Sequence, residues 1–142
     1  MRILAIDYGE KRIGLSVSDP LGLTAQGIDT IQNLNKKQVM TALLKICKDK
    51  EVSEVVIGLP VNMNGSLGPK AAEIMNLIPR MEKELGLPIR TWDERLTSRA
   101  AGRLMIKEGL SRKRQKEGSD RLAATMILQM FLESRRNNPP TH

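Results

Sequence analysis

Three groups of acidic residues have the type and spacing to do chemistry. Asp7 closes the apolar run of residues 3–6, Asp93 and Glu94 follow a later apolar segment, and Asp120 lies near the start of the last helical pattern. Converging carboxylates repel one another unless cations lie between them, so a convergent set predicts bound Mg²⁺ or Mn²⁺. If the groups stay apart, Asp7 caps a turn and the others complement helix N-termini.

Glycines accompany the first acid and a later loop. Residues 8–14 (YGEKRIG) place glycines where the backbone must approach something closely. Residues 58–65 (GLPVNMNG) form a polar, glycine-punctuated loop after a predicted strand. Such a loop is either a plain strand-to-helix connection or part of a site whose backbone amides hold a phosphate.

The elements that must position these residues follow from apolar periodicity. It predicts strands at 2–7, 12–18, 23–31, 54–59 and 88–92, and helices at 36–50, 69–85, 97–108 and 119–134. Short turns join the first three strands and suggest an antiparallel meander. The natural arrangement is an α/β fold, a mixed sheet flanked by helices.

Several boundaries follow from local residue types. Thr97 is a plausible N-cap and Gly109 ends the helix that it starts. Pro79 should kink or break the helix at 69–85. The basic stretch 111–118 is predicted to be a loop or a frayed turn. We expect one domain over residues 1–134 followed by a disordered tail at 135–142.

The net charge of +7 is concentrated in the second part of the chain. Residues 1–89 carry a net of +1, whereas residues 90–142 carry +6. A basic region suggests a polyanionic partner, although it also serves solubility. The side chains that we expect to contact nucleic acid are Lys11, Arg12, Asn62, Asn64, Arg95, Arg112, Lys113, Arg114 and Lys116.

The amino-acid composition limits which cofactors and which cellular compartment we expect. The single cysteine, Cys47, excludes an internal disulfide and sits in a predicted core stripe. Together with the lone histidine, His142, it argues against a zinc site. Nothing resembles a signal peptide or a membrane span, so we expect a cytoplasmic protein without a membrane partner.

Four motifs in series resemble one family. They are IDYGEKRIGLSVSD, GLPVNMNG, WDERLTS and SDRLAATMILQMFL, at residues 6–19, 58–65, 92–98 and 119–132. Together they resemble the YqgF-type family, whose members are described as Holliday-junction resolvases and as pre-16S rRNA nucleases. The resemblance covers about residues 2–133.

The resemblance implies a ribonuclease-H-like fold with sheet order 3-2-1-4-5. Asp7 would lie on the central strand, with Asp120 brought beside it by the last helix and Glu94 by the loop after the fifth strand. These three acids are the implied metal ligands and catalytic residues, with Asp93 as a substitute or supporting partner. Glu94 would have to be carried inward across two strand spacings, about 10 Å.

The implied reaction is phosphodiester hydrolysis assisted by Mg²⁺ or Mn²⁺. Arg12 and Arg95 could each pair with the scissile phosphate in a bidentate manner, or Arg95 could instead neutralise Glu94. The favoured substrate is the 5′ end of pre-16S rRNA, with branched DNA, as in a Holliday-junction resolvase, as the alternative. We expect a monomer or weak homodimer.

Two other classes of function remain to be weighed. An actin-like ATPase or sugar kinase shares the glycine-spaced first hairpin, but its site needs two such domains and this chain has the length of one. A non-catalytic RNA-binding factor of ribosome assembly is the other possibility. The intact set of acids argues against it.

Overall fold

The computed structural model describes residues 2–95 and 112–137, with side chains in the second range from Leu122 onward. Along the chain the elements are β1 (Arg2–Tyr8), β2 (Arg12–Ser18), β3 (Ala25–Gln32), α1 (Lys36–Asp49), β4 (Val52–Leu59), α2 (Pro69–Leu85), β5 (Ile89–Asp93) and α4 (Arg112–Asn137). Up to β5, every predicted strand and helix is confirmed to within two residues at each end.

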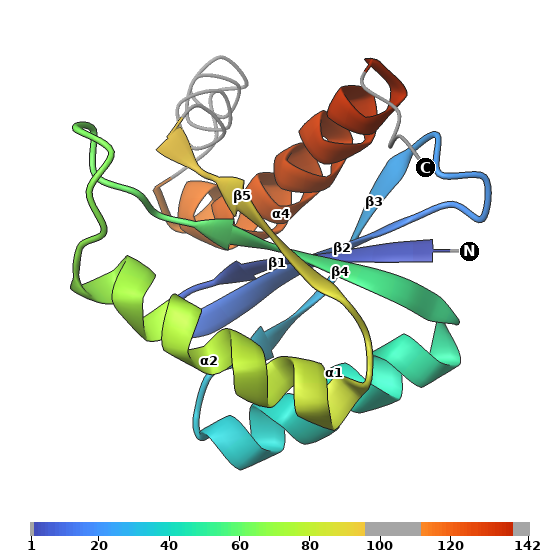
Figure 1. Cartoon of the computed structure of the whole chain (residues 1–142), viewed down its shortest axis with the longest axis horizontal. Helices are drawn as coiled ribbons and strands as arrows, with labels where there is room; N and C mark the ends of the chain where they lie inside the picture. The colour runs from blue at the N-terminus through green and yellow to red at the C-terminus, as the bar shows by residue number, and fades with distance from the viewer. Residues whose placement is uncertain (1, 96–111, 138–142) are drawn as a thin grey trace.

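The five strands form one mixed sheet with the order β3-β2-β1-β4-β5 (Figure 1). Strands β1, β2 and β3 are antiparallel neighbours, whereas β4 and β5 run parallel to β1. Parallel neighbours require a crossover, and α1 and α2 supply the connections into β4 and β5. The predicted sheet order and the ribonuclease-H-like fold class are therefore confirmed.

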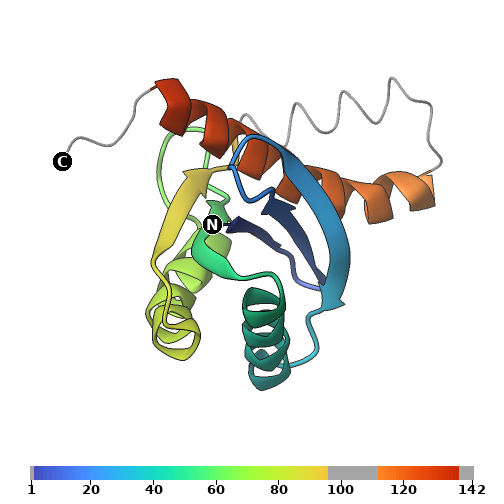
Figure 2. The same cartoon turned by 90° about the vertical axis from the view of Figure 1, so that its right-hand side faces the viewer.

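The sheet is covered on both faces (Figure 2). On one face, alternate residues such as Leu4, Ile6 and Leu15 pack with the buried sides of α1 and α2. On the other, Ile3 and Ala5 pack with α4 residues that include Ile127 and Leu128. Cys47 lies in the first of these cores, as its place in an apolar stripe predicted.

Small polar residues on β2 allow α4 to pack closely against the sheet. Its second face carries Ser16 and Ser18, which are buried rather than exposed. The Ser16 hydroxyl donates to the Ala124 carbonyl of α4 at 2.8 Å, and Ser18 Oγ accepts from the Ile3 amide at 2.8 Å. Buried hydroxyls that find such partners cost little, so small polar residues bring helix and sheet into direct contact.

Helix α2 begins and ends where its sequence indicates. Pro69 occupies the first turn, and Gly86 takes the left-handed conformation (φ 66°) that ends the helix. Pro79 was expected to kink or break the helix, and the helix continues through it to Leu85 without a break. Ile78 and Met81 on either side of it are buried in the core, and this burial offsets the lost backbone hydrogen bond.

Helix α4 corrects two boundaries. It starts at Arg112, so the basic stretch predicted as a loop or frayed turn is helical from that residue on. Arg, Lys, Gln and Glu are good helix formers, which accounts for the extension. It also continues to Asn137, where the sequence predicted a disordered tail from residue 135. Arg135 is held there by two hydrogen bonds to Glu54, at 2.6 and 2.7 Å.

Some expectations lie outside the described residues. They are the helix at 97–108 with its Thr97 cap, Gly109, and the last part of the tail, 138–142. Within the described part of the chain, none of the helices has the combination of length and apolar character that crossing a bilayer requires.

Candidate active site

Asp7 lies near the carboxyl end of β1, at the centre of the sheet. It alternates with Ile3 and Ala5, so it belongs to the face that α4 covers. On one side its partner in the β1–β2 ladder is Gly14. On the other, Gly58 follows directly after Ile57, the β4 partner of Ile6. Glycines on both neighbouring strands leave space around this carboxylate.

The Glu94 side chain uses the space at Gly58. A Cβ atom added to Gly58 would lie 2.7 Å from Glu94 Cγ, Cδ and Oε1. The Glu94 backbone is tied to the same strand, since its amide donates to the Leu59 carbonyl at 3.1 Å. The Glu94 side chain thus passes over β4 at a residue that has no side chain. In this way it reaches Asp7 on β1, which is two strand spacings from β5.

The two carboxyl groups interact directly. Burial is the largest cause that raises the pKa of Glu94, to about 9, and a hydrogen bond with Asp7 and the charge of Asp7 raise it further. The raised pKa favours the protonated form of Glu94, because two negative charges this close together repel. Paired carboxylates of this kind are also a strong oxygen-donor set for a divalent cation, which would take the place of that proton.

Lys70 is a basic residue near the pair that the sequence reading missed. It is the second residue of α2, and its Nζ lies 5.2 Å from the centroid of the Tyr8 ring. Its charge lowers the pKa of Glu94, opposing the effect of Asp7. One feature of the sequence could have indicated Lys70. It lies in the first turn of the helix that follows the 58–65 loop, and this turn faces the sheet edge that carries the acids.

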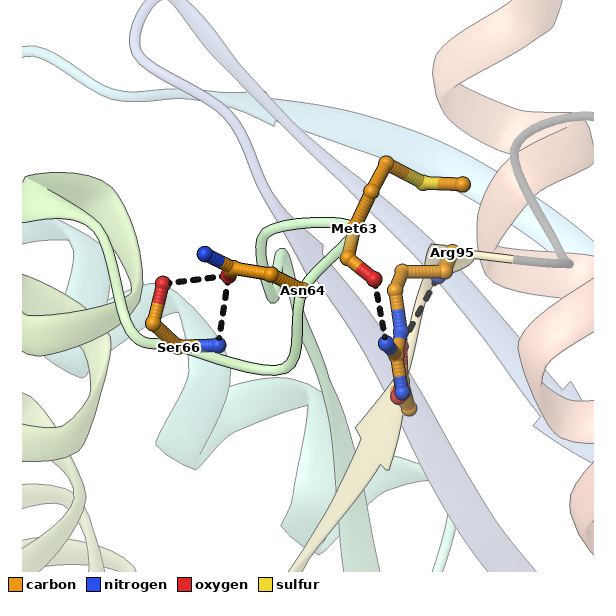
Figure 3. A network of polar contacts seen from close by, with 5 residues as sticks. Met63, Asn64, Ser66 and Arg95 are labelled. Carbon is orange, nitrogen blue, oxygen red and sulfur yellow. Dashed lines mark hydrogen bonds and ion pairs between the residues drawn. The ribbon is translucent and has the colours of Figure 1, made fainter.

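Asp93 and Arg95 flank Glu94 and bind each other. Arg95 Nε and Nη2 donate to the Asp93 carboxylate at 2.9 and 2.6 Å, and this contact lowers the pKa of Asp93. Arg95 Nη1 also donates to the Met63 carbonyl at 3.2 Å, across to the 58–65 loop (Figure 3). Arg95 therefore pairs with Asp93 and not with Glu94, and Glu94 is the acid of this motif that meets Asp7.

The loop after β4 is organised by its own side chains (Figure 3). Asn64 Oδ1 accepts from the Ser66 amide at 3.0 Å and from its hydroxyl at 2.6 Å. Asn62 Nδ2 donates to Ser66 Oγ at 3.1 Å. Both asparagines are exposed but shape the loop, so any contact that they make with nucleic acid would come from a preformed turn.

The turn between β1 and β2 holds the basic residues Lys11 and Arg12 at the same edge. The Gly9 amide donates to the Arg12 carbonyl at 3.1 Å, and a Cβ at Gly9 would collide with that oxygen. Asn33 secures the turn from outside, since its side chain donates to the Gly9 carbonyl at 2.8 Å and its amide to the Lys11 carbonyl at 2.9 Å. Gly9 is therefore required by a close backbone approach.

The third predicted acid, Asp120, lies within α4 but not in its first turn. It comes four residues, about one helical turn, before Ala124, whose carbonyl meets Ser16 of β2. The side chains of Asp120, Arg112, Lys113, Arg114 and Lys116 lie outside the described part of the structure. Among the side chains that are described, no three potential metal-binding acids, histidines or cysteines cluster.

Comparison with solved structures shows the class of fold. RuvC of Thermus thermophilus, in complex with a Holliday junction substrate, has a TM-score of 0.60 at 17% identity, over 96% of each chain. The fowlpox virus Holliday junction resolvase has a TM-score of 0.55 at 14% identity, over 94% of this chain and 99% of its own. The chain thus has the fold of the ribonuclease-H-like resolvases.

Sequence comparison assigns the family. The profile described as "RuvX: Holliday junction resolvase" matches residues 1–134, and the chain belongs to this family. A relative from Syntrophomonas wolfei is 45% identical over 94% of each chain, and one from Clostridium botulinum (strain Eklund 17B / Type B) is 48% identical over 94% of this chain and 97% of its own. Both relatives are named "Putative pre-16S rRNA nuclease".

Proposed function

We propose that this protein is a divalent-metal-dependent nuclease that cleaves precursor 16S rRNA near its 5′ end. The observation that carries the proposal is the Asp7–Glu94 carboxyl pair, held in contact over Gly58 at the carboxyl edge of the central strands. Ligand sites of open α/β sheets lie at this edge. The curated relatives bear the name of a pre-16S rRNA nuclease, and such an activity would place the protein in the cytoplasm.

Asp7 and Glu94 have the donor chemistry to hold Mg²⁺ or Mn²⁺, with Asp120 as the third ligand in our proposal and Asp93 held back by Arg95. Bound metal supplies an activated water and stabilises the leaving oxygen. The protein's own part is to orient the strand and keep the two carboxyl groups together. Lys11, Arg12, Lys70 and the basic start of α4 supply positive charge for the phosphate backbone.

The test is cleavage of precursor 16S rRNA by the purified protein with Mg²⁺ or Mn²⁺, beside the variants Asp7→Asn and Glu94→Gln. We expect each variant to lose at least about 100-fold in rate, because loss of a ligand exceeds the 10- to 100-fold effect of losing a supporting residue. Both should still bind the RNA, and both should bind Mn²⁺ more weakly by calorimetry. A wild-type protein that cleaves with no divalent metal, or an Asp7→Asn variant of full activity, would contradict the proposal.

The family description favours a second substrate, the four-way DNA junction. Resolution of a junction needs two active sites, so this alternative requires a dimer on the substrate. Cleavage of junction DNA and precursor rRNA measured side by side, with light scattering on the same preparation, separates the two. Preference for the junction by a dimer would replace the rRNA proposal. Binding of RNA without cleavage of either substrate would indicate a non-catalytic assembly factor.

A further inference from the structure

A pocket of about 420 Å³ lies beside Glu94, and the function proposed above gives it no ligand. The described residues that line it are Met63, Trp92, Asp93, Arg95 and Met130, which come from the 58–65 loop, from β5 and the residues just after it, and from α4. The volume lies within the usual range of small-molecule sites, about 300–1,000 Å³. A pocket of this size, next to the edge of the sheet that carries the acids, is large enough to bind a ligand group.

The chemistry of the walls suits a flat, partly polar ring. Trp92 contributes an indole, Met63 and Met130 contribute polarisable thioethers, and Arg95 contributes a planar cation. The Arg95 guanidinium is already held by Asp93 and by the Met63 carbonyl (Figure 3). Its plane is therefore oriented before any ligand arrives. Unstacked nucleobases bind to proteins by stacking on aromatic rings and guanidinium planes of this kind.

The Trp92 wall of the pocket is held in place by contacts with α4. The Trp92 and Phe131 rings meet edge to face, with centroids 6.2 Å apart and an interplanar angle of 84°. Arg135 in turn lies 4.6 Å from the Phe131 ring centroid, and it is held by Glu54. The indole is thus fixed between β5 and α4, which reduces the conformational entropy that binding must overcome.

The position of the pocket relates it to the carboxyl pair. Trp92 and Glu94 are two residues apart, and side chains at this spacing along a strand point to the same face of the sheet. Both therefore belong to the face that carries Asp7. The two lining residues Asp93 and Arg95 are the immediate neighbours of Glu94. A nucleic-acid strand with a phosphate at the pair could therefore place a neighbouring base at Trp92.

We propose that this pocket binds one unpaired nucleobase of the nucleic-acid strand, next to the phosphate on which the site at the Asp7–Glu94 pair acts. The inference rests on the proposed function, and it deepens it by naming a feature of the substrate: an unpaired nucleotide beside the cleavage position. Base stacking tolerates any sequence, because every base has a π-face. The site selects for an unpaired strand and not for a particular base.

The chain offers a direct reporter, since Trp92 is its only tryptophan. Intrinsic fluorescence is measured in EDTA, where no metal-assisted cleavage occurs, while a short single-stranded oligouridylate is added. A matched oligonucleotide carries one abasic nucleotide. Anisotropy of fluorescein-labelled versions measures the affinity of both strands independently of Trp92. We expect the complete strand to quench the tryptophan, and a strand whose abasic position meets the pocket to bind at least about fivefold more weakly.

Met63→Ala removes one wall of the pocket, and Met75→Ala is its control. Met63 is exposed on the loop and Met75 is exposed on α2, so neither substitution threatens the core. Met63→Ala should weaken binding of the complete strand about threefold or more and leave the abasic strand unchanged. Met75→Ala should alter neither.

The outcomes separate the two levels of the inference. Equal affinity for complete and abasic strands at every abasic position, or binding by anisotropy without any change in tryptophan fluorescence, overturns the pocket and leaves the nuclease proposal standing. Failure of both strands to bind by anisotropy contradicts the proposed function itself, and the pocket with it.

Discussion

The Glu94 carboxyl group lies directly over Gly58, with Cδ and Oε1 only 2.7 Å from where a Cβ of residue 58 would be. No other amino acid at position 58 leaves room for this path. The carboxyl pair therefore depends on the glycine in β4, because its missing side chain lets Glu94, the residue just after β5, reach across β4 to Asp7.

Gly58→Ala should separate function from folding. The new methyl group meets the flexible end of a side chain, so Glu94 can move aside and the fold should survive. Displacing a ligand by about 1 Å can cost up to about 100-fold in rate. We expect a 10- to 100-fold loss of metal-dependent cleavage, with a melting temperature close to that of the wild type.

A double-mutant cycle with Glu94→Ala isolates the cause. Once the Glu94 side chain is truncated, the methyl group at position 58 has nothing to displace. Gly58→Ala should then cause no further loss of Mn²⁺ affinity, measured by calorimetry. Additive losses in the two single variants and the double variant would show that the glycine acts by another route.

Lys70→Met tests the cation that lies beside the pair. Methionine retains much of the length of the side chain and removes the charge that lies 5.2 Å from the Tyr8 ring centroid. If Lys70 binds a phosphate, the variant should weaken RNA binding at every sequence and reduce the slope of log affinity against log salt by about one. The measurement is a salt titration of RNA binding in EDTA.

The control for Lys70→Met is Lys45→Met, an exposed substitution in α1. It removes the same charge from the face of the sheet opposite α4, far from the carboxyl pair. An equal loss of salt slope in both variants would assign the effect to net charge and would remove Lys70 from the site.

Glu54 should make stability depend on pH. Hydrogen bonds from Arg135 are the largest cause that lowers its pKa, opposed by burial and assisted by Arg90. Because the pKa is lower in the folded protein, the pair stabilises the fold fully above the ordinary glutamate value of 4.5 and loses this effect as the pH falls through the lowered pKa. Glu54→Gln should cost roughly 1–2 kcal/mol at pH 7 and much less at pH 3.

Urea unfolding of the wild type and Glu54→Gln at both pH values checks this difference, since the other carboxylates contribute equally to both proteins. Glu84→Gln is the matched control, because its pair with Arg80 is exposed on α2 at 3.3 Å. It should change stability by less than about 0.5 kcal/mol at either pH. A Glu54→Gln effect that is the same at pH 7 and pH 3 would assign the loss to packing instead of charge.

Local periodicity predicted most of the elements because their signals lie within a few residues. The alternation in β2, the proline that starts α2 and the glycine that ends it all act locally. The start of α4 was misplaced because a basic segment without an apolar stripe has the same sequence pattern in a loop and in a helix. Its end was misplaced because Arg135 is ordered by Glu54, 81 residues away in sequence.

The sequence by itself determined the candidate acids, the class of fold and the family. Strand periodicity is written locally, and four motifs in order resemble one family. Tertiary structure alone decided that Glu94, not Asp93, meets Asp7, that Arg95 binds Asp93, and that Lys70 and the Trp92 pocket adjoin the site. These contacts depend on the register of the strands and on which side chains cross a neighbouring strand. The residues involved are far apart in the sequence and come together only when the sheet forms.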